Sequence, residues 1–270
     1  MPQPLYCASP SRLLAWVDCP RRYRMQYLDR PRPLARPTRA HTSVGVTTHN
    51  ALREWWQLPW AERTPDAGAQ LVAESWIDSG FRDAAQSARW RDRAGSAVAR
   101  YLTGISGGWT PRAVERTVAL KTSTLSVTGR IDRLDERGSE VVVVDYKTRR
   151  VPSSRDEART SLALALYAVA AARTFARSCS RVELHHVPTG VVVGHDHTPE
   201  SLQRKLAEAE SIAADLRVAD VDYRESGADS TRFAPRPTAL CTWCDFRAHC
   251  PEGQQMGPEK SSWAGLAGDV

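Results

Sequence analysis

Hydrophobic residues in the first part of the chain recur every three to four positions, which is the spacing of an amphipathic helix. Ser9-Pro10 is typical of a helix start, because a capping hydroxyl is followed by proline at the first helical position. Cys19-Pro20 should end that helix and allow another to begin. Further helices are predicted at residues 43–58, about 66–79 and 87–103. Residues 1–110 are therefore predicted to form an N-terminal helical region.

After residue 110 the pattern changes to apolar runs of strand length that are bounded by turn residues. Strands are predicted at residues 113–120, 124–134, 140–147, 182–187 and 191–195. A helix is predicted at about residues 155–176, with Ser154 as its cap, and another from Thr198-Pro199 to about residue 217. This mixture predicts an α/β core over residues 111–235.

The turn at residues 136–139 joins two of these strands, and its centre fixes which residues oppose each other. A symmetric antiparallel hairpin around Gly138 and Ser139 places Asp132 directly opposite Asp145, with Lys147 on the same face. Two opposed carboxylates repel each other unless a cation lies between them. Residues 141–144 are all valine, which indicates a strand covered on both faces, so charges at its end need a reason.

This hairpin has two interpretations. Two carboxylates beside an ammonium group suit a site where Mg²⁺ or Mn²⁺ activates water against a phosphodiester. The alternative is an ordinary solvated cluster of ion pairs.

Composition and charge narrow the class of partner. The 270 residues suffice for one large domain or for a domain with a helical annex. Lys and Arg outnumber Asp and Glu by 37 to 31, which favours a polyanionic partner without requiring one. The longest apolar run, residues 162–172, is too short to span a bilayer, and we expect a cytoplasmic protein without membrane association. No glycine-rich phosphate loop suggests a nucleotide-hydrolysing or dinucleotide-binding enzyme.

Three of the six cysteines lie close together near the C-terminus, as Cys241, Cys244 and Cys250. Six cysteines are too few for a disulfide scaffold in a chain of this length, so this spacing indicates metal or cluster ligation over residues 236–253. Zinc and an iron–sulfur cluster both accept four thiolates, and the spacing does not choose between them. The available fourth ligands are Cys7, Cys19, Cys179 and His249. Residues 254–270 are low in apolar content and are expected to be disordered.

Four short motifs, in this order and spacing, carry a resemblance to a known family. They are Cys19-Pro-Arg-Arg-Tyr23 with the late cysteines, Gly45-Val-Thr-Thr-His49, Gly129-Arg-Ile-Asp132 and Asp145-Tyr-Lys147. A lone histidine such as His49 is by itself more often a core residue than a ligand. Together the motifs resemble RecB-like nucleases of the PD-(D/E)XK superfamily. The similarity is greatest to the iron–sulfur subgroup that includes the CRISPR-associated RecB-like exonucleases and the AddB nuclease domain.

The resemblance implies a restriction-endonuclease-like core with a mixed sheet, and it assigns roles to the motif residues. His49, Asp132, Asp145 and the backbone carbonyl of Tyr146 would hold the catalytic Mg²⁺ or Mn²⁺. Lys147 would position or activate the attacking water, and Glu115 matches a family glutamate whose role is less fixed. The late cysteines and Cys19 would bind a structural [4Fe–4S] cluster.

The resemblance also suggests how DNA would be held. Tyr167 lies in the helix after the hairpin, but Ala163 stands where the family usually has glutamine, which puts the positioning of DNA in doubt. Residues 30–39 form a Pro/Arg-rich loop, either a mobile connection or an arm that meets phosphates. The arginines of that loop proposed for DNA binding are Arg30, Arg32, Arg36 and Arg39.

The predicted function is a metal-dependent DNA exonuclease that acts on single-stranded ends in DNA repair or processing, with a helicase or repair-complex partner left open. One alternative is a DNA-binding accessory subunit that keeps the fold and cluster but cuts weakly or not at all. Another is a zinc-stapled adaptor without a nucleic-acid role. The joint presence of His49, Asp132, Asp145 and Lys147 favours the enzyme, because a binding module has no need of this set.

Overall fold

The structure is a computed structural model that describes residues 4–105 and 110–266. Its contacts group the chain into two compact units. The first unit consists of Met1–Arg36, Ala119–Gly129 and Glu200–Ser261, and the second of Pro37–Val118, Arg130–Pro199 and Ser262–Val270. Both units are discontinuous in sequence, so this grouping cuts across the consecutive segments that the sequence predicts.

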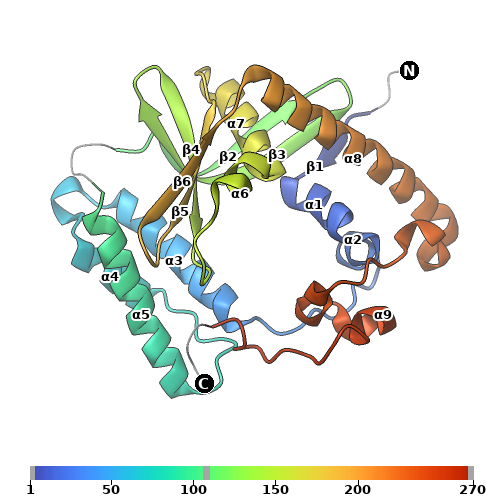
Figure 1. The fold of residues 1–270 in the computed structure, drawn as a ribbon, viewed down its shortest axis with the longest axis horizontal. Helices are drawn as coiled ribbons and strands as arrows, with labels where there is room; N and C mark the ends of the chain where they lie inside the picture. Colours follow the sequence, from blue (N-terminus) through green and yellow to red (C-terminus); the bar gives the residue numbers. More distant parts are fainter. Residues whose placement is uncertain (1–3, 106–109, 267–270) are drawn as a thin grey trace. The chain divides into compact units, whose positions relative to one another are not determined.

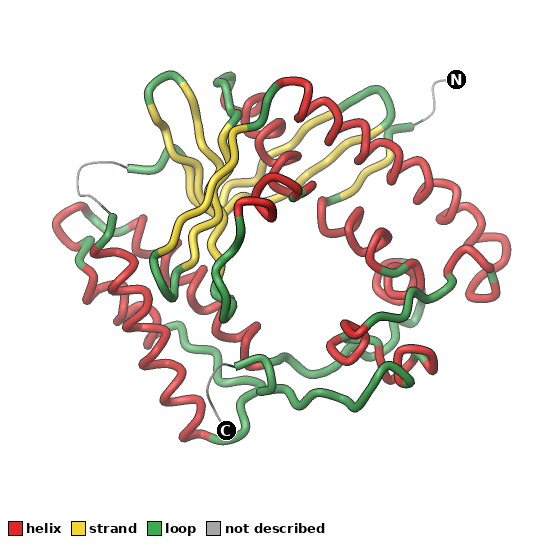
Figure 2. Tube along the Cα trace, viewed as in Figure 1, coloured by secondary structure: helices red, strands yellow, loops and turns green. Residues whose placement is uncertain are grey.

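The second unit is built on a mixed sheet, as predicted (Figures 1 and 2). β3 pairs antiparallel with β4, β4 parallel with β5, and β5 antiparallel with β6, while β2 also pairs with β3. The strands are β2 (Ala113–Lys121), β3 (Leu125–Arg137), β4 (Glu140–Lys147), β5 (Arg181–His186) and β6 (Val191–Asp196). β2 ends in the first unit and β3 begins there, because residues 119–129 belong to that unit.

The β3–β4 hairpin has the predicted register. Arg133 opposes Val144, and Arg137 opposes Glu140 next to the turn, where Gly138 adopts a φ of +64° that favours glycine. Extending this register by one pair opposes Asp132 to Asp145. All four valines of β4 are buried, which confirms that both faces of this strand are covered.

Helices cover both faces of β4 in the second unit. Val142, Val144 and Tyr146 share a buried cluster with residues of α3 and α5, among them Leu52 and Val98. α7 packs on β4 and β5. These helices are α3 (Ala40–Gln57), α4 (Pro65–Glu74), α5 (Ala84–Thr103), α6 (Arg155–Thr160) and α7 (Leu162–Phe175), with a short 3₁₀ turn, η1 (Trp60–Glu62).

The prediction of a single helix at residues 155–176 is wrong, because the helical conformation is interrupted at Ser161. Ser154 begins α6 with a reciprocal capping box to Glu157, as its position predicts. Ser161 then leaves the helical conformation, and its hydroxyl accepts a hydrogen bond from the Leu164 backbone N–H at 3.2 Å. A second cap inside the apolar run therefore starts a new helix, α7.

The first unit contains β1 (Tyr6–Ala8), α1 (Pro10–Asp18), α2 (Pro20–Tyr27) and most of α8 (Pro199–Ser226). Ser9 caps α1 as predicted, whereas β1, which pairs in parallel with the start of β3, was not predicted. A polar cluster ties α1 and α2 to α8: the Tyr23 hydroxyl donates to Asp220 at 2.7 Å, and Arg12 pairs with the same carboxylate at 3.0 Å. This cluster explains why α8 continues beyond the predicted end at residue 217.

The C-terminal part of the first unit consists of short turns. They are η2 (Gly227–Asp229), η3 (Thr231–Phe233), η4 (Ala239–Trp243), η5 (Arg247–His249) and the short helix α9 (Pro251–Gln254). Beyond Gln254, where the sequence predicts disorder, the backbone carbonyl of Lys260 accepts from Arg36 at 2.8 Å and that of Ser262 from Ala40 at 3.1 Å. The last part of that prediction, residues 267–270, lies outside the described residues. Within the described ranges, no helix has the length and apolar character that crossing a bilayer needs.

Candidate metal centre

Side chains from three elements of the second unit converge on one point. His49 comes from α3, Glu115 from β2 and Asp132 from β3, and their ligand atoms all lie within 4.8 Å of one another. His49 Nδ1 is 3.5 Å from Asp132 Oδ1. The structure therefore brings together two predicted metal ligands and the glutamate whose role the sequence left less defined.

The packing of α3 explains how His49 reaches the strands. Leu52 and Trp56 of α3 are buried in the same cluster as Tyr146 of β4, which fixes the helix on this side of the sheet. The His49 ring meets the Tyr146 ring edge to face at 5.8 Å. His49 is only partly buried, unlike the fully buried Leu52, and it is not a core residue of α3.

Glu115 has an unusual backbone conformation for a strand residue. Its φ is +47°, in the left-handed region that residues with side chains rarely adopt. Arg130 Nε lies 3.1 Å from the Glu115 carboxylate and donates to the Glu115 backbone carbonyl at 3.2 Å, so one guanidinium group contacts both the side chain and the backbone of Glu115. Such conformations are concentrated at functional sites, where neighbouring structure compensates their free-energy cost. The strain at Glu115 therefore supports a role for this carboxylate.

Asp132 and Asp145 lie at the end of the hairpin with Lys147. Asp132 Oδ2 accepts a hydrogen bond from the Tyr146 backbone N–H at 2.8 Å, and Lys147 Nζ is 2.6 Å from Asp145 Oδ2. Asp145 is not part of the group of three found among the described residues, and its carboxylate is paired with the ammonium group of Lys147. The predicted cluster of two carboxylates and an ammonium thus exists, with Lys147 as the cation next to Asp145.

The carboxylates of this site lie in an environment that disfavours their negative charge. Burial, and then the charge of Asp132, raise the pKa of Asp145, although Lys147 opposes the rise. The same two causes raise the pKa of Glu115. Burial lowers the pKa of His49, but the hydrogen bond and charge of Asp132 outweigh it, so that the net shift is upward. Burial and the proximity of other carboxylates thus raise the pKa of both carboxyls, and the same negative charge raises that of His49.

The donor set fits a hard divalent cation. Carboxylate oxygens and one imidazole nitrogen suit Mg²⁺ or Mn²⁺, whereas no thiol belongs to the group. Ligands at about 2.0–2.1 Å from Mg²⁺ stand about 3–4 Å from one another, and the ligand atoms of the observed group lie within 4.8 Å of one another. That Asp145 and the backbone carbonyl of Tyr146 also bind such an ion stays a prediction.

A buried ion pair that the sequence did not predict follows Asp132 on β3. The side chains of Arg133 and Asp135 are each 1% exposed and are joined by hydrogen bonds of 2.8 and 3.1 Å. Arg133 also donates to the hydroxyls of Tyr101 and Tyr146 at 3.0 and 2.9 Å. The only signal in the sequence is the alternation of charges at Arg133, Asp135 and Arg137 at the end of β3, which is equally common on exposed strands.

The residues proposed for DNA contact lie in different places. Tyr167 of α7 is near the site: burial, and then the charges of Asp145 and Asp132, raise its pKa to about 12. Ala163 is one turn before it in the same helix, where the family usually has glutamine.

The arginines of residues 30–39 are held to different degrees. Arg30 and Arg32 are exposed, the latter over the Phe246 ring at 5.5 Å. Arg36 is largely covered and pairs with Glu259. Arg39 immediately precedes α3. The loop is therefore partly anchored to the first unit through Arg36, while Arg30 and Arg32 stay accessible.

The structure also gathers the predicted thiolates in the first unit. Burial is the main cause that raises the pKa of Cys244, and the charge of Cys19 contributes to the rise. A Cβ atom at Gly253 would lie 3.4 Å from Cys250 Sγ and 3.6 Å from the Cβ of Cys241, which places those cysteines side by side. Of the other candidate ligands, Cys7 is exposed on β1, Cys179 is buried in the second unit, and a ring nitrogen of His249 lies 3.1 Å from the Leu34 carbonyl oxygen.

Comparison with known proteins decides the family. The model of the PD-(D/E)XK nuclease superfamily matches residues 8–251. The chain belongs to this superfamily. Its mixed sheet with helices is that of the PD-(D/E)XK nuclease fold, and the predicted fold class is confirmed. The RecB-like iron–sulfur subgroup stays a prediction.

Two further comparisons were made with this PD-(D/E)XK protein. The crystal structure of SSO0001 is similar over 92% of this chain and 87% of that chain, with 15% identity and a TM-score of 0.40. No match was found among curated proteins. PD-(D/E)XK nucleases use divalent metal ions and act on DNA, and the His49–Glu115–Asp132 group is consistent with metal binding in this member.

Proposed function

We propose that this PD-(D/E)XK protein is a metal-dependent deoxyribonuclease that degrades single-stranded DNA from its ends. The observation that carries the proposal is the convergence of His49, Glu115 and Asp132 within 4.8 Å, beside the Asp145–Lys147 ion pair. A merely structural ion pair would not need three further ligand-type side chains around it. The preference for single-stranded ends rests on the resemblance to RecB-like exonucleases.

The roles of the residues follow from their positions. His49, Glu115, Asp132 and Asp145 would hold the cation, which when bound would polarise the scissile phosphate and lower the pKa of a water molecule. Lys147 would orient the attacking water through its ammonium hydrogens, and Asp145 keeps that ammonium at the end of β4. The Tyr146 N–H fixes the second oxygen of Asp132, so that one oxygen stays directed toward His49.

A structural [4Fe–4S] cluster in the first unit is part of the proposal. The four proposed ligands, Cys19, Cys241, Cys244 and Cys250, all lie in the first unit. Cys241 and Cys250 both lie next to Gly253, which supports a four-thiolate site. The backbone N–H of Thr238 donates to Cys241 Sγ at 3.3 Å, and such hydrogen bonds to sulfur are usual around iron–sulfur clusters. The cluster would tie α2 to the C-terminal turns and add its ligation free energy to folding.

One observation favours a second candidate function, a DNA-binding accessory subunit that cleaves weakly. Ala163 faces the same side of α7 as Tyr167, and its methyl group offers no amide to contact DNA. Substrate positioning would then depend on Tyr167 and on other side chains around the site. This candidate predicts DNA binding with little turnover, which the following experiment separates from the nuclease.

The test is cleavage of end-labelled single-stranded DNA by the anaerobically purified protein with Mn²⁺ or Mg²⁺. Asp132→Ala, Asp145→Ala and Lys147→Ala should each reduce cleavage to the background while leaving DNA binding intact. The matched control is Asp156→Ala, which removes an exposed carboxylate on α6 whose partner is Arg159. The control should cleave like the wild type, because an exposed pair contributes only about 0–1 kcal/mol to folding.

The outcomes separate the candidates. Full activity in any of the three site variants would refute the assigned site. Binding of DNA by the wild type without cleavage in either metal would favour the accessory subunit, and the absence of both would refute a nucleic-acid function.

A further inference from the structure

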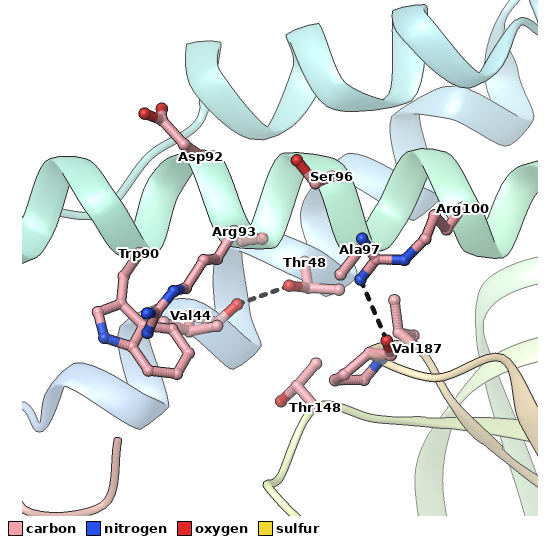
Figure 3. Close-up of a pocket in the computed structure, with 12 residues that line it drawn as sticks. Val44, Thr48, Trp90, Asp92, Arg93, Ser96, Ala97, Arg100, Thr148 and Val187 are labelled. Atoms are coloured by element: carbon pink, nitrogen blue, oxygen red, sulfur yellow. Dashed lines mark hydrogen bonds between the residues drawn. The ribbon is translucent and has the colours of Figure 1, made fainter. Parts of the chain in front are cut away.

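A pocket of about 550 Å³ opens in the second unit between α3 and α5 (Figure 3). Its other walls are the residue after β4 and the turn between β5 and β6. This volume is within the range of sites that bind a small organic group, about 300–1,000 Å³. None of the residues assigned above to metal, cluster or DNA contact lines it.

The interior of the pocket is apolar, and its rim is cationic. Val44, Ala94, Ala97 and Val187 contribute methyl groups, and α5 adds an aromatic ring and two guanidinium groups. These three are Trp90, Arg93 and Arg100.

The orientation of the rim residues favours an anionic aromatic ligand. Arg93 lies over the Trp90 ring at 5.2 Å, and Arg100 reaches the Pro188 carbonyl oxygen at 3.4 Å (Figure 3). The two arginines are two turns apart on α5, about 10 Å along its axis at 1.5 Å per residue. Asp92 points away from this space in Figure 3, and its carboxylate is 3.4 Å from Arg91. The field inside the rim is therefore positive, although one carboxylate borders the pocket.

The pocket and the metal centre share two segments of the chain, one on α3 and one at the end of β4. Thr48 lines the pocket one residue before His49 on α3, and Thr148 lines it one residue after Lys147. These walls are close together, because a Cβ atom at Gly45 of α3 would lie 3.3 Å from the Thr148 hydroxyl. The pocket is thus built on the same two segments of the chain as the metal centre.

We propose that this pocket receives one base of the single-stranded DNA. The base would lie against Trp90 and the apolar interior, and the flanking phosphates would be bound by Arg93 and Arg100. Aromatic stacking with cationic flanks is the way proteins hold single strands without reading sequence. A neutral peptide would use the apolar interior but not the two guanidinium groups. The inference rests on the proposed function, since it assigns a subsite of that nuclease.

The test measures affinity for fluorescein-labelled single-stranded oligonucleotides by anisotropy, with Asp132→Ala as the background to prevent cleavage. Trp90 packs against the buried cluster, so Trp90→Leu, which keeps an apolar side chain, is used in preference to alanine. Trp90→Leu should weaken binding about 5- to 150-fold, the range for loss of one stacked base. Trp90→Phe should restore most of the affinity because it keeps a ring. Trp60→Ala is the control, since Trp60 is 56% exposed and outside the pocket.

A second arm identifies the base. Oligonucleotides that carry one abasic site at successive positions should show a single position where the loss of the base weakens binding to the Asp132→Ala protein. The same abasic substitution should have no further effect once Trp90→Leu is introduced, because the base and the ring form one interaction. Arg93→Gln and Arg100→Gln should weaken binding to intact and abasic strands alike.

The possible failures can be told apart. If Trp90→Leu binds as tightly as Trp60→Ala, or if the abasic effect is the same with and without Trp90, the pocket is not a base subsite and the nuclease proposal stands. If the wild type neither binds nor cleaves single-stranded DNA, the proposed function fails and the subsite fails with it. Equal melting temperatures of the Trp90 and Trp60 variants exclude unfolding as the cause of weaker binding.

Discussion

Removal of the buried guanidinium of Arg133 should strongly destabilise the protein. In Arg133→Met an unbranched apolar side chain of similar length replaces the cation, and Asp135 is left as a buried carboxylate. The side chain of Arg133 also lies over the rings of Trp56 and Tyr146, each at 5.4 Å, and these packing contacts survive in part with methionine. The change in stability of Arg133→Met therefore reports mainly the loss of the charge and less the loss of side-chain volume.

The magnitude follows from what remains around Asp135. Breaking a buried ion pair costs about 3–5 kcal/mol, because the remaining charge has lost its partner. Arg137 compensates partly, since it donates to Asp135 at 3.3 Å, but its side chain is half exposed and it also binds Glu183 at 2.8 Å. The Tyr101 and Tyr146 hydroxyls keep hydrogen-bond partners without Arg133. We therefore expect a loss near the lower end, about 3 kcal/mol.

Urea unfolding followed by circular dichroism measures this loss as a lower midpoint with an unchanged slope. The double variant Arg133→Met/Asp135→Leu is the critical comparison, because replacing both charges with apolar side chains removes the uncompensated carboxylate. It should recover most of the stability that the single variant loses. A single variant within 1 kcal/mol of the wild type, or a double variant less stable than the single one, would refute this reasoning.

Three other expectations concern Glu115, Cys19 and Glu183. Glu115→Gly should be more stable to urea than Glu115→Ala. Both variants lack the carboxylate, but alanine keeps a side chain at a left-handed φ, which costs about 1–2 kcal/mol. The reverse order of stability, which is usual inside strands, would contradict the backbone strain at Glu115. Cys19→Ala should remove the brown colour expected of [4Fe–4S] and lower the melting temperature, whereas Cys7→Ala and Cys179→Ala should keep the colour; full iron occupancy in Cys19→Ala would overturn the ligand assignment. Burial raises the pKa of Glu183, but hydrogen bonds from its basic neighbours outweigh that effect and hold the pKa well below its ordinary value. The stability from this shift is full above the unfolded pKa of about 4.3 and is lost as the pH falls through the folded value, so the urea midpoint of Glu183→Gln should fall less than that of the wild type below pH ~4.

The sequence alone determined the local features of this protein. The register of the β3–β4 hairpin was predictable because the turn at Gly138 fixes which residues oppose each other, and so Asp132 and Asp145 were expected at one end. The start of α1 at Ser9-Pro10 was predictable for a similar reason, since the cap and the proline act on their own turn. Each of these features depends on a few neighbouring residues.

The resemblance supplied what local patterns could not. His49 is far from the hairpin in sequence, and its position on an apolar helix face favours a core residue over a ligand. Only its place in an ordered set of motifs indicated a shared site with Asp132. Similarly, the cysteine spacing left four possible partners, and the resemblance selected Cys19.

The tertiary structure decided which distant groups meet. The approach of Glu115 to His49, with a left-handed backbone, depends on how β2 and α3 pack against the sheet, and no local pattern encodes it. The burial of Arg133 and Asp135 is likewise a property of the assembled unit, because alternating charges are ordinary on an exposed strand. The pocket at Trp90 forms only where α3, α5 and two strand ends come together. Such features depend on packing between segments far apart in the chain, and that packing is what periodicity and capping signals do not contain.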